Sequence, residues 1–407
     1  MKKTIFILFL ATIWTQTTST NISGFGEIQM IHDASSAGVG GSHYFSTQSN
    51  GFSLNSPSSL WKTKDVKLGF STSFTNFTNN SNAELNSNTL NNISFTTPVG
   101  ENQAMSFGVF PHTRSNFYIQ TNQEDGERIT YDDNIYAPAY TYHSEGGISR
   151  FFLSYSKLFD EGLSVGFTWY KNFGNLFLTD SVLTYQVSTN SETGQTNYSL
   201  NDIAASKKTH NFSGNSFSLE GRIEKDNHAI VVSTYWQSSL RVNTHYQSLV
   251  GNSEKYINRS KGISFTGIGS GYLYKINGVT GIAGEIHYLK PVQTDAELFG
   301  ITEDRLISFN SGVFRRIANP KIGGWNFINL STGVYSVHHK YSLGDITDYG
   351  LTFGLGIEYL NQKNVINLAL SAGKKSGLFD DISDESYISL KVGFTVGEHW
   401  FVKRRRN

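Results

Sequence analysis

The sequence predicts a closed antiparallel transmembrane β-barrel of about fourteen strands. Three observations indicate this fold class. Apolar and polar residues alternate with period two from about residue 64 onward, short turns alternate with long polar connectors, and a short apolar segment lies near the start of the chain. Aromatic residues make up 14% of the chain and charged residues 16%, with 39 glycines, a composition typical of all-β proteins.

The first element along the chain has the layout of a secretory signal peptide. Lys2 and Lys3 precede an apolar run at residues 5–14 (IFILFLATIW), and small polar residues follow at 15–20. The run is too short to cross a bilayer as a helix. We therefore expect a signal peptide at residues 1–20. The sequence holds no cysteine, so we expect neither disulfides nor a lipid attached at a cysteine.

Strands follow one another from residue 64, and residues 387–396 (YISLKVGFTV) show the pattern clearly. Ile388, Leu390 and Phe394 share one face there, and Ser389 and Lys391 share the other, as expected for a strand with two different surroundings. Each predicted strand is long enough to cross a bilayer at the usual tilt. The predicted strands are 64–77, 89–98, 103–111, 148–159, 162–173, 211–224, 228–238, 261–275, 279–290, 304–317, 324–339, 347–360, 364–374 and 386–396.

The connections between these strands fall into short turns and long polar segments, which alternate along the chain. Short periplasmic turns and longer extracellular loops are typical of bacterial outer-membrane barrels. A soluble β-sandwich or propeller is the alternative, but a fourteen-stranded lumen is too wide to be filled by its own side chains. We therefore place the barrel in lipid, in the bacterial outer membrane. Within the long connector 174–210, residues 182–189 have strand character of their own. The predicted long connectors are 78–88, 112–147, 174–210, 239–260, 291–303, 340–346 and 375–385.

The chain shows no recognisable catalytic or cofactor motif. It lacks a G-x-S-x-G, an H-E-x-x-H and a Walker loop, so we predict no enzyme activity, no cofactor and no metal site. Lys plus Arg and Asp plus Glu are 33 each, which gives zero net charge. A nucleic-acid partner is not expected, because such partners need a basic surface.

Charged residues at lumen-facing positions of the predicted strands are the first candidate functional residues. They either pair across the lumen and stiffen it, or they line a solute path or hold a plug in place. The candidates are Glu220, Arg222, Glu285, His287, Glu358 and Lys391.

Residues 31–62 (IHDASSAGVGGSHYFSTQSNGFSLNSPSSLWK) contain two phrases that resemble the N-terminal signature of the FadL/TodX-type outer-membrane transport family. The first is D-A-S-S-A-G-V-G-G at 33–41, and the second is S-P-S-S-L at 56–60, where Ser56 and Ser58 replace an Asn and an Ala of the family pattern. The ending at 396–405 (VGEHWFVKRR) is similar to that of related barrels. The residues of this plug motif are Asp33, Gly38, Gly40, Gly41, Ser56, Pro57 and Leu60.

The resemblance implies an N-terminal hatch, or plug, at residues 21–62 inside a barrel formed by 63–407. It further implies facilitated diffusion of hydrophobic small molecules, such as long-chain fatty acids or aromatic compounds, which bind extracellular loops and leave sideways into the membrane. The loops 174–210 and 239–260 carry apolar residues that would suit such a ligand. The loop candidates are Leu176, Phe177, Leu178, Leu249 and Val250.

Two alternative functions remain open at this point. PorV-like barrels share a similar N-terminus and serve as carrier subunits for secreted proteins, which would make a secreted protein the partner. A structural barrel with a filled lumen and no transport is the other alternative. The expected partners are therefore outer-membrane lipid and either a hydrophobic small molecule or a secreted protein.

Overall fold

The computed structural model describes fifteen stretches of the chain. The predicted signal peptide, Leu249 and Val250 lie outside them. The described residues are 26–30, 32–47, 53–79, 84–120, 128–132, 134–159, 162–189, 195–248, 253–261, 264–293, 303–318, 325–341, 344–360, 363–377 and 384–398.

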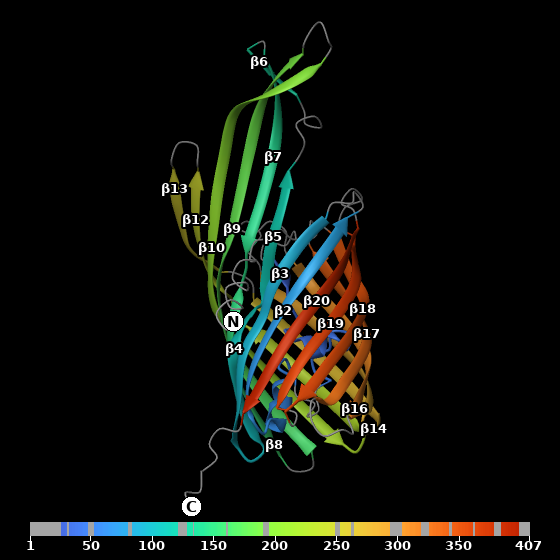
Figure 1. Ribbon diagram of the computed structural model, residues 1–407. Coiled ribbons are helices and arrows are strands. Elements are labelled where there is room, and N and C mark those ends of the chain that lie inside the picture. The colour runs from blue at the N-terminus through green and yellow to red at the C-terminus, as the bar shows by residue number, and fades with distance from the viewer. Residues whose placement is uncertain are drawn as a thin grey trace, which may run out of the picture.

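Almost all of these residues belong to one antiparallel sheet that closes on itself (Figure 1). In the described part of the chain, the barrel wall has fourteen strands. β2 closes the barrel by pairing with β20 on one side and with β3 on the other. The elements are β1 (Glu27–Ile28), α2 (Ala34–Ala37), η1 (Pro57–Lys62), β2 (Val66–Asn79), β3 (Glu84–Gly100), β4 (Gln103–Pro111), β5 (Thr113–Gln120), β6 (Ile129–Tyr131), β7 (Asn134–Gly146), β8 (Ser149–Leu158), β9 (Leu163–Thr189), β10 (Thr196–Lys225), β11 (His228–Gln237), β12 (Arg241–Ser248), β13 (Glu254–Lys261), β14 (Ser264–Asn277), β15 (Thr280–Gln293), β16 (Glu303–Ala318), β17 (Trp325–Tyr341), β18 (Gly344–Tyr359), β19 (Asn364–Ser376) and β20 (Glu385–Glu398).

The wall has a different environment on each side, which explains the period-two pattern. In β18, Leu351 and Phe353 are exposed on the outer surface, whereas Thr352 between them is buried. In β20, Ile388 and Leu390 are exposed on the same outer surface. An apolar outer band with a polar interior is the arrangement that lipid imposes on a barrel. The prediction of a closed fourteen-stranded antiparallel barrel is confirmed.

Three of the predicted long connectors are wrong, because they form strands rather than loops. β9 and β10 stay paired from Leu163↔Ile223 to Thr189↔Thr196. The segment predicted as a loop at 174–210 is therefore mostly strand. The segment 239–260 likewise contains β12 and most of β13, and 112–147 contains β5, β6 and β7. These segments carry Thr, Val, Tyr and Ile, which favour strands even outside the membrane.

These additional strands form a sheet that projects beyond the barrel on the side opposite the C-terminus (Figure 1). We call it the extracellular sheet; it consists of β5, β6, β7, β12, β13 and the outer halves of β9 and β10. β7 pairs with β9 from Ile135↔Val187 to Gly146↔Leu176, and β12 pairs with the middle of β10, from Ser206↔Ser248 to Ser213↔Arg241. Its position follows from the topology, since the short turns at the other end are periplasmic in such barrels.

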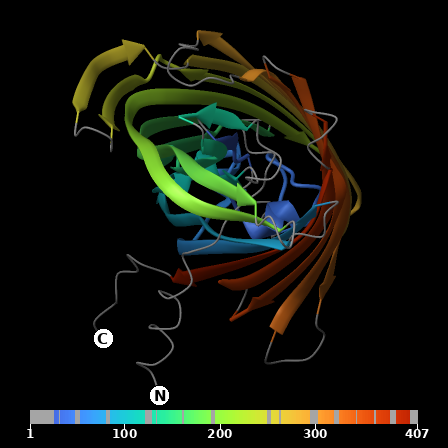
Figure 2. The ribbon, with the colours of Figure 1, turned by 90° about the horizontal axis from the view of Figure 1, so that it is seen from above.

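The N-terminal residues lie inside the ring of strands, as Figure 2 shows for the segment coloured blue. We call residues 26–30, 32–47 and 53–65 the plug. Within it, α2 contacts β18, β19 and β20, and η1 contacts β4, β8 and β9 on the opposite part of the wall. The plug therefore spans the lumen between two parts of the barrel wall.

The helices of the structure are short. No helix in the described residues is both long enough and apolar enough to cross a lipid bilayer.

An arginine on the lipid-facing surface should test the membrane placement of the wall. Phe353, 55% exposed near the centre of β18, and Ile203, 50% exposed in the extracellular sheet, are similarly accessible. Phe353→Arg should lower the free energy of unfolding by about 2–4 kcal/mol because it places a charge in hydrocarbon. Ile203→Arg is the control, for which we expect a change close to zero. Urea unfolding in lipid vesicles measures both, and equal effects would contradict the placement.

Candidate functional site

The plug begins with a single helical turn whose N-terminus is capped by Asp33. Its Oδ1 accepts the backbone N–H of Ser36 at 2.7 Å and the hydroxyl of Ser35 at 2.5 Å, and its Oδ2 accepts the hydroxyl of Ser36 at 2.9 Å. An aspartate at this position satisfies N–H groups that the first turn leaves without partners. Asp33 therefore fixes the fold of α2, and the motif residue has a structural role.

Glycines follow α2 because the plug there touches the wall backbone. Gly40 has a φ of +67°, and a Cβ at this position would lie 2.4 Å from the carbonyl oxygen of Ser311. A Cβ on Gly38 would lie 2.6 Å from the Cα of Gly354. The N–H of Gly40 donates to the Oγ1 of Thr352 at 2.8 Å. Only glycine permits both this approach and the left-handed conformation at position 40.

Glu285 of β15 binds the turn that follows these glycines. Its carboxylate accepts the backbone N–H groups of His43 at 2.7 Å and Tyr44 at 2.9 Å, together with the hydroxyl of Ser42. His287 lies 3.2 Å from the same carboxylate. The side chain of Glu285 is buried, and its acceptor positions are occupied by the plug, so this carboxylate holds the plug in place.

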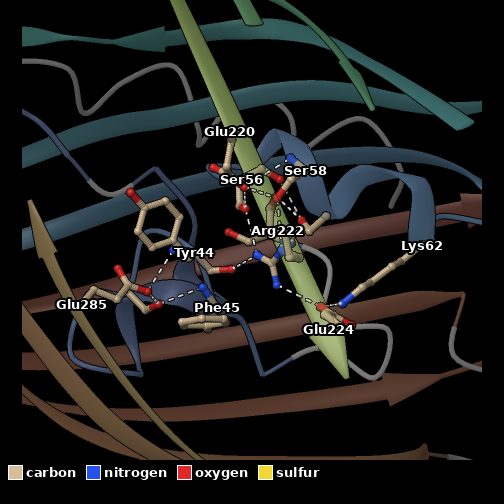
Figure 3. Close-up of polar contacts among 12 residues, drawn as sticks. Tyr44, Phe45, Ser56, Ser58, Lys62, Glu220, Arg222, Glu224 and Glu285 are labelled. Carbon is tan, nitrogen blue, oxygen red and sulfur yellow. Dashed lines mark hydrogen bonds and ion pairs between the residues drawn. The ribbon is translucent and has the colours of Figure 1, made fainter. Parts of the chain in front are cut away.

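The second half of the plug is bound by Glu220 and Arg222 of β10 (Figure 3). Glu220 accepts the hydroxyls of Ser56 and Ser58 and the N–H of Ser58. Arg222 donates to the hydroxyls of Ser58 at 3.1 Å and Ser56 at 2.9 Å, and to the carbonyl of Tyr44 at 2.7 Å. Both charged side chains are 1% exposed. A buried charge pair of this kind is tolerable only because every group has a partner.

Pro57 and Leu60 complete the motif beside this network. Pro57 is at the first position of η1, where its missing N–H costs nothing. Leu60 is fully buried against Ala104 and Leu54. Ser56 is the residue that departs from the family pattern, and here its hydroxyl contacts both Glu220 and Arg222.

Two further ion pairs fasten the ends of the plug. Glu27 of β1 binds Lys375 of β19 at 2.6 Å, and Lys62 of η1 binds Glu224 of β10. Burial, together with the nearby Arg222 guanidinium, lowers the pKa of Lys62 to about 8. The plug is therefore attached to the wall by charged groups along its whole described length.

The two remaining lumen-facing candidates, Glu358 and Lys391, lie in different surroundings. Glu358 is buried and pairs within the wall, with Arg316 at 3.1 Å and Asn329 at 2.7 Å. Lys391 lines a cavity beside the plug and interacts electrostatically with Asp33. The structure thus brings Glu220, Arg222, Glu285 and His287 together around the plug and leaves Glu358 outside that group.

Two loop candidates for ligand capture occupy a packed core instead of an exposed surface. Leu176 and Leu178 are 0% and 5% exposed, in a cluster that includes Ile28 of the plug. Strand pairing turns both side chains inward, so we do not assign them a capture role. Phe177, between them, is exposed. The cluster lies across the barrel mouth and consists of Ile28, Ile148, Leu176, Leu178, Phe212, Leu240, Val242, Phe265 and Leu306.

The wall is interrupted between β3 and β5. β3 pairs with β4 up to Ile93↔Val109, whereas β5 pairs with β7 and, through Thr113 and Arg114, with β1 of the plug. No ladder joins the outer half of β3 to β5 in the residues that the structure describes. We call this interruption the wall gap. The side chain of Arg114 crosses it to the carbonyl of Asn88, at 3.2 Å, and to the hydroxyl of Thr89.

The sequence explains why the chain turns inward at the gap. Pro111 ends β4 because it has no N–H to donate. After it, the N–H of His112 donates to the carbonyl of Ile148 at 2.7 Å, and the carbonyl of His112 accepts the N–H of Gln29 in the plug at 2.8 Å. On the neighbouring strand, Gly146 and Gly147 have φ values of +115° and +142°. These glycines let the strand bend together with its partner.

Two cavities lie behind the gap. A cavity of about 560 Å³ is lined by plug residues such as Glu27, by Arg114 and Lys391, and by the outward residues Leu90 and Ile93. A smaller cavity of about 110 Å³ lies between the plug and the wall at mid-height. Phe110 and Gln29 line both cavities, so the two spaces adjoin.

Sequence reasoning missed several residues of this site. Arg150, Arg114 and Lys375 were not identified as candidates, although Arg150 lies at the same parity in β8 as the buried Phe152 and Ser154. That parity is a usable signal for an inward charge. Glu27 lies outside the strands to which the pattern applies, and nothing local in the sequence indicates its partner.

The fold and the internal plug define the class of protein. The chain has the fold of FadL-type outer-membrane β-barrels. A channel described as the CymD monoaromatic hydrocarbon channel matches with a TM-score of 0.53 and 12% identity, covering 92% of this chain and 100% of its own. A FadL homologue of Pseudomonas aeruginosa matches with a TM-score of 0.58 and 9% identity, covering 91% of this chain and 98% of its own. At such low identity the likeness establishes the fold.

The family model that matches this chain is that of BamG, over residues 1–266 and 338–407. This is more than half of the 407 residues, and the chain belongs to the BamG family. The resemblance to FadL and TodX expected from the N-terminal motif is thus found in the fold, whereas the matching family is a different one. No curated protein matches the sequence.

Removing Arg222 should release the plug. Arg222→Ala leaves the buried Glu220 carboxylate without its counter-charge, and we expect a loss of about 3–5 kcal/mol in stability. The temperature at which the folded form disappears on a heat-modifiability gel measures this loss. The control is Lys208→Ala, whose exposed pair with Asp180 at 3.7 Å should contribute about 0–1 kcal/mol. A similar result for both variants would contradict the role of Arg222.

Proposed function

We propose that this protein is a plugged outer-membrane barrel through which small hydrophobic molecules with one polar end pass sideways into the membrane. The wall gap between β3 and β5 carries the proposal. The cavity behind it extends from Glu27 in the plug to Leu90 and Ile93 on the lipid-facing surface. It thus offers a continuous space between the lumen and the hydrocarbon of the bilayer.

The obstruction of the axial route supports a lateral one. The apolar cluster packs tightly at the mouth, with Leu240 and Leu306 each 1% exposed. Below it, buried carboxylates and Arg222 hold the plug, and releasing it would leave these charges without partners at high cost. The passage through the wall is therefore less obstructed than the passage along the axis.

The lining of the larger cavity indicates the class of solute. Arg114 and Lys391 contribute positive charge and Glu27 and Glu145 negative charge, while Leu90, Ile93 and Val109 contribute apolar surface toward the lipid. A bare hydrocarbon gains nothing from the charged side. A molecule with one polar end and an apolar tail, such as a long-chain fatty acid, matches both sides.

Closing the wall gap with a cross-link should stop this passage. Since the chain has no cysteine, Thr89→Cys with Arg114→Cys can be joined selectively by a short bismaleimide that takes the place of the Arg114 side chain. We expect the linked barrel to transfer radiolabelled oleate into vesicles no faster than protein-free vesicles do, and the unlinked double variant to retain transfer.

The matched control for this experiment is Val334→Cys with Leu351→Cys, two exposed residues already paired across β17 and β18 that do not line the cavity behind the gap. Linking them leaves the gap unchanged, so transfer should continue. Transfer that persists through the Thr89–Arg114 link would refute the lateral route.

A second candidate function is that of an accessory barrel that binds another protein, and the extracellular sheet favours it. β9 and β10 are 27 and 30 residues long, far more than a bilayer requires. The projecting part exposes large apolar and aromatic side chains, including Tyr131 at 74% and Tyr140 at 53%. Exposed tyrosines in aqueous surroundings are typical of the centre of a protein interface.

Charged substitutions on the extracellular sheet should separate the two functions. Tyr131→Asp combined with Tyr140→Asp should abolish co-purification of an outer-membrane protein partner with the tagged barrel, because it places charge in the contact. Oleate transfer by the same variant should be unchanged. Unaltered co-purification would remove the support that the sheet gives to the accessory role.

A further inference from the structure

A buried cation without a carboxylate lies beside the smaller cavity. Arg150 is 6% exposed. Its Nε donates to Asn172 at 2.7 Å, and its Nη2 donates to Gln237 at 2.8 Å and to the hydroxyl of Tyr235. The guanidinium also lies over the rings of Tyr170 and Tyr235, at 5.1 and 5.0 Å. Among the described residues no acidic side chain pairs with Arg150, and its Nη1 makes no hydrogen bond. A buried charge in this state is expected to bind an anionic group.

Histidines supply further polar groups around the same cavity. His32, His43 and His112 line it. The Nδ1 atoms of His32 and His43 and the Nε2 atom of His112 are buried without a hydrogen-bond partner in the described structure. Burial lowers the pKa of His43 to about 4 and that of His32 well below its usual value, so both plug imidazoles are neutral at pH 7. A neutral imidazole has one N–H group, which His43 donates to the backbone of Met30. His32 and His112 can still donate a hydrogen bond to an acceptor in the cavity.

The other side of the cavity is aromatic and apolar. Phe110, Phe152, Tyr170 and Leu289 line it, and His32 stacks on Phe110 with a centroid distance of 3.9 Å. The volume of about 110 Å³ is close to that of an engineered cavity of about 150 Å³ that binds benzene. One aromatic ring therefore fits, whereas a long alkyl chain does not.

Glu220 is the acidic residue among the lining residues, and its charge is already compensated. The hydroxyls of Ser56 and Ser58 and the N–H of Ser58 bind its carboxylate, and Arg222 is its counter-charge. It therefore does not neutralise Arg150. The polar residues that line the cavity beside Arg150, His32 and His112 among them, offer hydrogen-bond donors.

We infer that the cavity between the plug and the wall is a binding site for a small aromatic monocarboxylate. The carboxylate accepts hydrogen bonds from Nη1 of Arg150 and from the imidazoles of His32 and His112, and the ring lies between the phenylalanine and tyrosine side chains. This site goes beyond the proposed passage, since it requires neither the wall gap nor transfer across the membrane.

Benzoate titrated into the purified full-length barrel by calorimetry tests this inference. The wild-type protein should bind benzoate and should bind benzamide, its neutral analogue, at least about tenfold more weakly, because only the carboxylate pairs with Arg150. Arg150→Gln should weaken benzoate binding by a similar factor and leave benzamide unchanged. Ser154→Leu, which fills the cavity, should weaken both.

Arg316→Gln is the matched control, since Arg316 faces the lumen but lines a different cavity near the periplasmic end. It should leave benzoate binding unchanged. Heat-modifiable migration shows that each variant is folded, and Arg150→Lys, which keeps the charge, replaces Arg150→Gln if the latter fails to fold; it should retain a preference for benzoate over benzamide.

Absence of benzoate binding at millimolar concentration would overturn the inference and leave a cavity that holds water only. Equal binding of benzoate and benzamide, or unchanged binding in Arg150→Gln, would overturn it as well. Binding that persists when the cross-linked gap stops oleate transfer, or when no transfer occurs at all, would separate this site from the proposed passage.

Discussion

The width of a fourteen-stranded barrel is the constraint on which the rest of the structure depends. Side chains from such a wall cannot reach one another across the lumen, so the interior is filled by a segment of the chain itself. That segment brings backbone N–H groups into a buried space where each needs a partner. Glu285 and Glu220 supply these partners from the wall, and Arg222 balances the charge that they introduce. The serines and glycines of the plug follow from the same requirement, since small residues allow the contact to be close.

The barrel strands could be predicted because lipid and lumen impose opposite demands on successive residues. Alternation located β18 and β20 to within a few residues. Apart from residues 182–189 of β9, the extracellular sheet was predicted as loop, because water surrounds much of it and the contrast between two faces is weak. Residues such as Tyr140 and Ile203 are exposed there without any lipid to explain them.

The candidate site could be predicted in part. The alternation within each strand predicts that Glu220, Arg222 and Glu285 face inward. Of the motif residues, Ser56 contacts two of these side chains. Their pairing is a property of the folded barrel: the Ser56 and Glu220 side chains meet across 164 residues of sequence. Arg150 follows the same parity but was missed, because a single positive charge in a strand does not reveal that it lacks an acidic partner.

The position of the plug at the N-terminal end constrains the order of folding. The first residues to be made end up enclosed by strands made later, and the contact between Ser42 and Glu285 joins residues 243 apart. The wall closes where β2 meets β20, the first and last barrel strands. A sheet that closed before its leading segment had entered would exclude that segment, so capture of the N-terminus must precede closure of this seam. Contacts so distant in sequence form slowly, and the late seam gives them time to do so.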